Sequence, residues 1–282
     1  MGVRWRVAMA VLAVLAAATA PSQAQGDARV ERGRYLVESI AACGNCHTPQ
    51  GPGGPQLDKT LAGGFLAEEK PFTAYAPNIT PDRETGIGGW TDAQIVASIR
   101  EGRRPDGSLI GPPMPIGLYR GLSDNDVAAM VAYLRTVKPV KNVVPRSVYR
   151  MPLPPSYGPP VGRVADVDPR DRIAYGAYLA GPLGHCTECH STPGPQGAPD
   201  LQNRLGAGGM VFTGPWGTSV ASNITPSGLR GYSDAALKKV ITAGLRPDGS
   251  RLKPPMGTAY YARMTEADLD ALVAYLRSLP PK

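Results

Sequence analysis

The sequence predicts an all-α fold made of two copies of one domain, joined by a proline-rich linker. A run of the form Cys-x-x-Cys-His stands at 43–47 and again at 186–190, and other short motifs recur at nearly the same spacing. Apolar residues in both copies follow the spacing of amphipathic helices. The other repeated motifs are Asn-Ile-Thr-Pro at 78–81 and 223–226, Arg-Pro-Asp-Gly-Ser at 104–108 and 246–250, and Ala-Tyr-Leu-Arg at 132–135 and 274–277.

The N-terminus has the features of a secretory signal peptide. Arg4 and Arg6 form a positive start, 7–19 are apolar, and a small-x-small run ends at Ala24. We therefore predict a signal peptide over 1–24, cleaved after Ala24, and a periplasmic mature protein. A retained membrane anchor is the alternative, but the apolar run is short for a span of about 20 residues.

Residues 25–138 are expected to form the first domain. Asp27 can cap a helix that runs into the first Cys-x-x-Cys-His motif. The segment 48–70 is rich in glycine and proline and is predicted to be loop. Thr91 begins a capping-box pattern that opens a middle helix, and Ser123 can cap the last helix.

Residues 169–282 are expected to repeat this plan as the second domain. Asp168 can cap its first helix, Ser233 can open the middle helix, and Thr265 begins a second capping-box pattern. Between the domains, 139–168 form a linker that cannot be helical and should be extended, because it contains many prolines. This linker either spaces the domains or lies along their surfaces, and its apolar residues favour the second interpretation.

Gly33 and Gly176 occupy equivalent positions in the first helix of each copy. A glycine inside a helix costs about 1 kcal/mol relative to alanine, so its repetition needs a reason. We expect both glycines to allow close approach of the last helix, near Tyr133 and Tyr275.

The Cys-x-x-Cys-His runs are the attachment signature of c-type haem. Two thiols form thioethers with the haem vinyl groups, and the adjacent histidine binds the iron. A zinc site needs four ligands, whereas each copy offers three. A redox dithiol in a thioredoxin-like fold would need strands alternating with helices. We therefore predict two covalently bound haem c groups, attached through Cys43, Cys46, Cys186 and Cys189, with His47 and His190 as iron ligands.

The second iron ligand at each site is expected to be methionine. The remaining histidine, His185, directly precedes Cys186 and is held on the same side as the proximal ligand. Met114 and Met256 stand at the same repeat position, each after two prolines that fix the backbone. They are predicted to bind iron opposite His47 and His190.

An iron with both axial positions filled passes single electrons and has no position for a substrate. The sequence therefore predicts an electron-transfer protein without catalytic residues. The alternative is a dihaem redox enzyme, such as a peroxidase or a thiosulfate-oxidising cytochrome, which would need an open iron. The net charge is +7, but the sequence contains no basic run with interleaved aromatic residues. This argues against nucleic-acid binding.

With these motifs, the chain resembles class I cytochrome c domains in tandem. It is similar to the cytochrome c subunits of periplasmic alcohol, gluconate, fructose and nicotinate-type dehydrogenases. The resemblance implies a dehydrogenase as electron donor and a cytochrome or terminal oxidase as acceptor. Those subunits commonly have three attachment motifs and a membrane anchor, so for this chain we expect membrane association only peripherally or through a partner. The residues that carry the resemblance are 78–82, 85–92, 104–107 and 112–115.

Trp90, Tyr232, Arg104 and Arg246 recur in the loops of the two copies. They are interpreted either as neighbours of the haem propionates or as solvent-facing turn residues.

Overall fold

The computed structural model describes residues 1–2, 23–195 and 197–282. Most of the predicted signal peptide, 1–24, lies outside these residues, so its cleavage remains a prediction. Within the described part of the chain, no helix combines the length and the apolar character needed to cross a membrane.

The middle and last helices of the first copy begin at their predicted caps, but the predicted cap at Asp27 is wrong, because the first helix begins at Gln23. Thr91 forms the predicted capping box with Gln94, and the Ser123 hydroxyl accepts a hydrogen bond from the Asp126 amide. The helices of this copy are α1 (Gln23–Glu38), α2 (Cys43–His47), α3 (Asp92–Arg100), α4 (Ile116–Tyr119) and α5 (Asp124–Leu134).

The second copy repeats this order with a different start. The predicted cap at Asp168 is wrong, because the first helix begins at Arg172 and Asp171 caps it by accepting from the Ala174 amide at 3.0 Å. The helical elements are α6 (Arg172–Tyr178), the π-helical turn η2 (Leu179–Leu183), α7 (Cys186–Cys189), α8 (Asp234–Ala243), α9 (Thr258–Tyr261) and α10 (Glu266–Ser278).

The prediction of an all-α fold is wrong, because the described chain also contains three small antiparallel sheets and is mixed α and β. Part of the predicted loop at 48–70 and the residues after it form hairpins. In β4, burial alternates between residues, the pattern expected of a strand with one face on the core. The elements are β1 (Gln50–Gly51) with β2 (Gly54–Pro55), the 3₁₀ turn η1 (Leu57–Lys59), β3 (Gly64–Glu69) with β4 (Phe72–Ala76) and β5 (Val148–Tyr149), and β6 (Val211–Gly214) with β7 (Gly217–Val220).

The linker lies along the first copy, as its apolar residues suggested. Its strand β5 adds to the edge of β4, with Tyr149 opposite Phe72. Farther along, the Asn142 amide donates to the Ala62 carbonyl at 2.9 Å, and the Tyr157 hydroxyl donates to the Ile110 carbonyl at 2.9 Å. The linker is therefore part of the first copy's surface.

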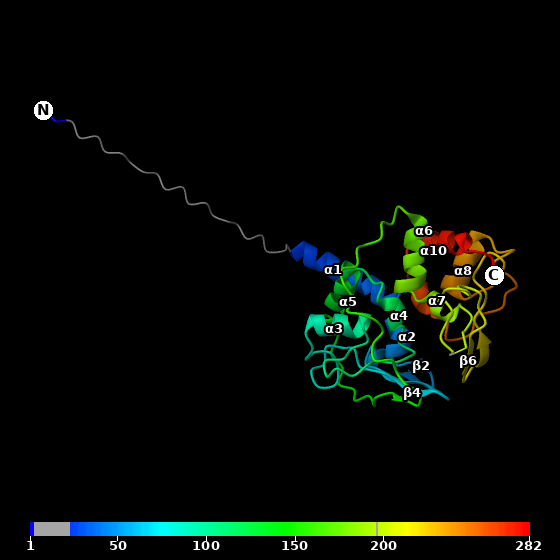
Figure 1. The fold of residues 1–282 in the computed structure, drawn as a ribbon, viewed down its shortest axis with the longest axis horizontal. Helices are drawn as coiled ribbons and strands as arrows, with labels where there is room; N and C mark the ends of the chain where they lie inside the picture. The colour runs from blue at the N-terminus through cyan, green and yellow to red at the C-terminus, as the bar shows by residue number, and fades with distance from the viewer. Residues whose placement is uncertain (3–22, 196) are drawn as a thin grey trace.

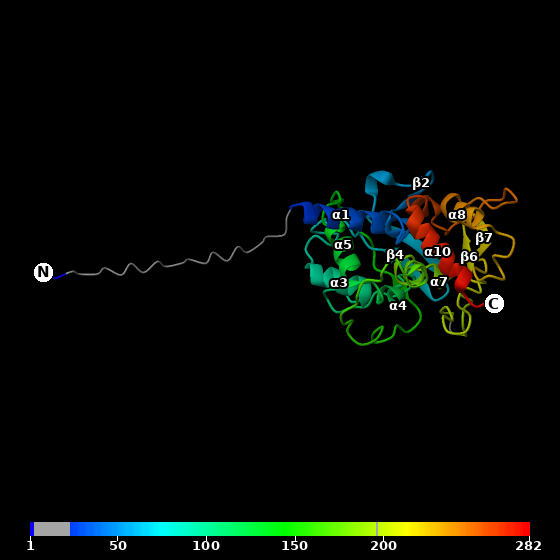
Figure 2. The same ribbon diagram turned by 90° about the horizontal axis from the view of Figure 1, so that it is seen from above.

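The first and last helices of each copy cross at a glycine, as predicted. A Cβ placed on Gly33 would lie 1.8 Å from the Ala129 carbonyl oxygen, and one on Gly176 would lie 2.1 Å from that of Ala271. No side chain fits at either position. The crossing brings α1 against α5 (Figures 1 and 2) and α6 against α10 (Figure 1).

One continuous apolar core joins the two copies. Leu36 and Ile40 in the first and Leu179 and Leu183 in the second are fully buried in the same cluster. The helices of the first copy lie toward the N-terminal side of the molecule and those of the second lie around the C-terminus (Figure 1). The two attachment motifs are therefore carried by parts of one packed unit.

Candidate haem sites

The first Cys-x-x-Cys-His motif forms its own short helix, α2. The chain enters it through Ala42, which has the left-handed φ of 46°. Residues three and four apart lie on one face of a helical turn, so Cys43, Cys46 and His47 project to the same side. The two cysteines are not joined by a disulfide.

The second motif has the same local structure. Helix α7 is entered through His185, whose φ is 41°, and His190 follows its last residue. The left-handed turn directs the His185 ring toward the first copy, where it packs edge-on against Tyr119 at 5.9 Å between ring centroids. His185 is thus a residue of the contact between the copies.

Both motif histidines are oriented by a backbone carbonyl. The Nδ1 atom of His47 lies 2.8 Å from the Pro77 oxygen, and that of His190 lies 2.7 Å from the Ser222 oxygen. A proton on Nδ1 leaves Nε2 as the free lone pair, which is the arrangement seen for metal-bound histidine. Burial lowers the pKa of both imidazoles, which favours the neutral form that binds iron.

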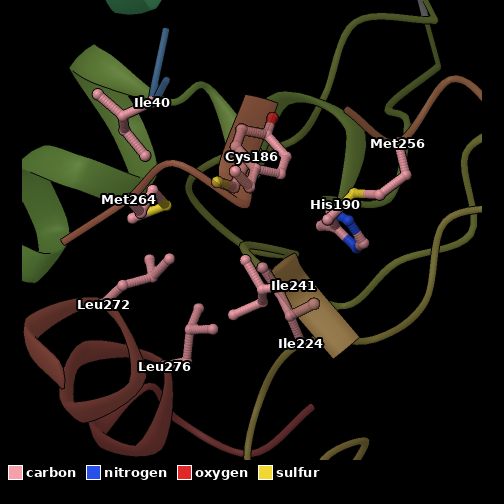
Figure 3. Close-up of a pocket in the computed structure, with 10 residues that line it drawn as sticks. Ile40, Cys186, His190, Ile224, Ile241, Met256, Met264, Leu272 and Leu276 are labelled. Carbon is pink, nitrogen blue, oxygen red and sulfur yellow. The ribbon is translucent and has the colours of Figure 1, made fainter. Parts of the chain in front are cut away.

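An apolar pocket lies over the second motif. Figure 3 shows Cys186, His190 and Met256 around it, so the structure brings together three of the residues predicted for this site. The pocket holds about 390 Å³, including space open to solvent. The remaining lining is apolar and aromatic: Ile40, Ile224, Ile241, Tyr261, Met264, Leu272 and Leu276.

Met114 occupies the equivalent place in the first copy. Its carbonyl accepts from the Ile116 amide at 2.8 Å, as the Met256 carbonyl accepts from the Thr258 amide at 3.0 Å, so both loops turn in the same way into a short helix. The Met114 side chain is half-buried against the core. The iron-binding roles of Met114 and Met256 remain predictions.

A cytochrome c family model matches residues 30–138 and 173–280, one segment in each copy. The chain belongs to the cytochrome c family. It is 34% identical to the fructose dehydrogenase cytochrome subunit of Gluconobacter japonicus, over 90% of this chain and 53% of that protein. It is also 34% identical to a nicotinate dehydrogenase subunit of Pseudomonas putida, over 89% and 21% of the two chains.

A shorter relative matches over most of its length. The diheme cytochrome c-type protein of Cereibacter sphaeroides is 30% identical over 84% of this chain and 82% of its own. The first two relatives are longer, and the chain spans about half or less of their length. Family membership confirms the predicted cofactor, and this cytochrome c carries two covalently bound haem c groups, one for each domain.

The described structure fits that cofactor and not a redox dithiol. Burial raises the pKa of Cys46 and Cys186 to about 11 and of Cys43 and Cys189 to about 12. A reactive dithiol needs a lowered thiol pKa, so these cysteines are poor nucleophiles at neutral pH. The apolar pocket beside Cys186 instead provides the surroundings that a haem ring requires.

The two recurring arginines are held within their own turns. Nη1 of Arg104 donates to the Leu109 carbonyl at 2.7 Å, and Nη1 of Arg246 donates to the Arg251 carbonyl at 3.3 Å. These contacts close the loop that each arginine begins, and the role beside a haem propionate remains a prediction.

Sequence reasoning missed a residue that the first copy contributes to the second site and a buried tyrosine beside the first motif. Ile40 of the first copy lines the pocket of the second. Tyr119 is buried between the motifs, where burial first and then the Cys43 and Cys46 thiols raise its pKa. Tyr119 and Tyr261 occupy equivalent repeat positions, and this equivalence was the signal available in the sequence.

Proposed function

We propose that this cytochrome c is a periplasmic dihaem electron carrier that takes electrons from a dehydrogenase and passes them to a downstream acceptor. The acceptor would be a terminal oxidase or a quinone or cytochrome chain. The observation that carries the proposal is the repetition, in both copies, of an attachment motif together with a methionine loop at one repeat position.

The proposed iron ligands are His47 with Met114 and His190 with Met256. When bound, haem c supplies a one-electron redox centre, and the histidine–methionine pair sets a raised reduction potential. The chain's own residues attach the ring and orient each imidazole through the Pro77 and Ser222 carbonyls, and at the second site they surround the ring with an apolar wall. An iron ligated on both sides leaves no position for a peroxide or thiosulfate substrate, so the enzyme alternative is not favoured.

The donor is proposed from the relatives' names and from the chemistry of the site. Several relatives are subunits of dehydrogenases, for fructose in one case and nicotinate in another. A dehydrogenase of small organic substrates would need a separate one-electron carrier such as this chain. Membrane association would then be peripheral or come through the partner.

Replacement of each methionine tests the ligand assignment. Met114→Leu and Met256→Leu should each remove about half of the weak absorption band near the red end of the visible spectrum, because this band reports iron–methionine bonding in the oxidised protein. The measurement is the spectrum of each purified variant, with Met130→Leu as the control, since Met130 is buried in the core of α5. A full band in either ligand variant would contradict the assignment at that site.

Reduction kinetics test the proposed role. A periplasmic dehydrogenase from the same cell should reduce the wild-type haems at least as fast as it turns over its substrate. Haem reduction slower than that turnover would contradict the proposed role as electron carrier.

A further inference from the structure

The two copies meet through a pair of equivalent tyrosine contacts. Tyr35 of α1 reaches the start of α10 in the other copy, where its hydroxyl donates to Asp268 Oδ2 at 2.5 Å. The same hydroxyl accepts a hydrogen bond from the Thr265 amide at 3.1 Å. One tyrosine therefore bonds both the amide of the N-cap residue, Thr265, and a carboxylate in the first turn of the helix.

The second contact repeats the first with the copies exchanged. Tyr178 of α6 donates to Asp126 Oδ2 at 2.9 Å and accepts from the Ser123 amide at 3.1 Å. Tyr35 and Tyr178 occupy equivalent repeat positions, and so do Asp268 and Asp126. The arrangement is that of an isologous dimer interface built within one chain.

These polar groups are withdrawn from water. Tyr178 is 5% exposed, and Asp126 and Asp268 are each 7% exposed. Buried carboxylates and hydroxyls are costly unless they are hydrogen-bonded, so each tyrosine contact depends on the other copy being in place. Asp126 has a further partner in Arg32 Nε at 2.8 Å, within its own copy.

The first attachment motif also touches the methionine loop of the second site. Asn45 Nδ2 donates to the carbonyl of Pro255, the residue before Met256, at 3.1 Å. A Cβ on Gly44 would lie 2.6 Å from the Tyr260 hydroxyl, so the two surfaces meet without space for a side chain. Together with Ile40 in the second pocket, these contacts link the geometry of one haem site to that of the other.

We propose that Tyr35 and Tyr178 are positioning residues that lock the two copies together and hold the two haem sites at one fixed separation. A fixed separation of the haem sites would serve the electron-carrier role proposed above. The purpose of the lock therefore rests on that proposed role. The lock itself is a property of the folded chain and is tested without any dehydrogenase.

Hydrogen exchange tests the contacts directly. In Tyr35→Phe the Thr265 amide loses its acceptor, and in Tyr178→Phe the Ser123 amide loses its acceptor. Each amide should exchange at least tenfold faster in its own variant, measured by amide exchange on the intact haem protein. The matched control is Tyr157→Phe, which removes a hydrogen bond from the linker and should leave both amides unchanged. Unchanged exchange in the two interface variants would overturn the proposal.

The separation of the sites is the second measurement. Dipolar electron paramagnetic resonance between the two oxidised haem irons should give one narrow distance in the wild type and in Tyr157→Phe. The Tyr35→Phe/Tyr178→Phe double variant should give a broader distribution with a longer mean. Its two midpoint potentials should also move closer together, because charge on one site then acts less on the other. A narrow, unchanged distance in the double variant would overturn the proposal.

A second pair of variants keeps the test independent of the tyrosines. Asp268→Asn retains an acceptor for Tyr35 and should keep the wild-type distance, whereas Asp268→Ala should broaden it. Equal effects of the two substitutions would show that the hydrogen bond does not set the position.

Discussion

Single residues at these sites act across the boundary between the copies. Ile40 is fully buried at the end of the first helix and lines the pocket that contains His190 and Met256. The motif histidines, by contrast, receive their orientation within their own copy. The immediate ligand geometry is therefore local, while the apolar surroundings of the second site are shared.

Ile40→Ala should affect the second site more than the first. Removal of the buried side chain should lower the free energy of unfolding by about 2–5 kcal/mol and admit water beside the second haem. The potential of that haem should fall, because a more polar site stabilises the oxidised charge. Redox titration of the variant checks this, with Val37→Ala as the control, since Val37 is also buried but does not line the pocket. An equal shift of the two haem potentials would contradict the inference that Ile40 acts through the wall of the second pocket.

At the scale of elements, one crossing of two helices is built twice. Both crossings place a glycine of the first helix against the backbone of the last, within a distance that excludes any side chain. The β3–β4 hairpin of the first copy has a counterpart in the β6–β7 hairpin of the second. The first hairpin is extended by the linker strand β5, which pairs with β4.

Gly33→Ala and Gly176→Ala should each destabilise the protein by several kcal/mol, on the order of 3, because the clash is with backbone and requires the helices to separate. Chemical denaturation measures this change. Gly117→Ala in α4 is the matched control, because a Cβ there meets nothing within 4 Å. That control should be neutral or stabilising by about 0.5–1 kcal/mol, and a similar loss in all three variants would count against the close approach as the cause.

The element scale also shows where the sequence was read incorrectly. Helices with Ser or Thr caps were predicted well, since a cap is a local signal between residues three apart. The sheets were missed because their strands are short and lie in a glycine-rich segment predicted to be loop. Strand β5 pairs with a segment more than 70 residues earlier, and such pairing leaves no local pattern.

At the scale of the whole molecule, the two copies form one unit with a shared core and reciprocal tyrosine contacts. Burial, and next the hydrogen bond to Asp268, raises the pKa of Tyr35 from 10.0 to about 12. Burial likewise raises the pKa of Tyr178. Both hydroxyls are thus held in the neutral form that donates to a carboxylate.

Alkaline pH should weaken this unit. Below pH 10 both tyrosines are neutral in the folded and unfolded states, so their contribution is constant. Between about pH 10 and 12 the unfolded chain loses the protons first, and the free energy of unfolding should fall by about 1–2 kcal/mol for Tyr35, after allowance for its partial exposure. Unfolding measured from pH 9 to 12 should show a shallower fall in Tyr35→Phe than in the wild type, and parallel curves would exclude the Tyr35 contact as the source.

The cofactor, the duplication and the cytochrome c family can all be predicted from the sequence alone. Attachment of haem c depends on residues adjacent in the chain, and a repeat is visible as an offset, so neither requires a fold. How the two copies meet could not be predicted in this way and is seen in the folded chain. The partner of Tyr35 lies 233 residues away and that of Tyr178 lies 52 residues away, and no periodicity relates such pairs. Burial of the shared core brings them together, because apolar surface left on each copy is removed from water only when the other copy covers it.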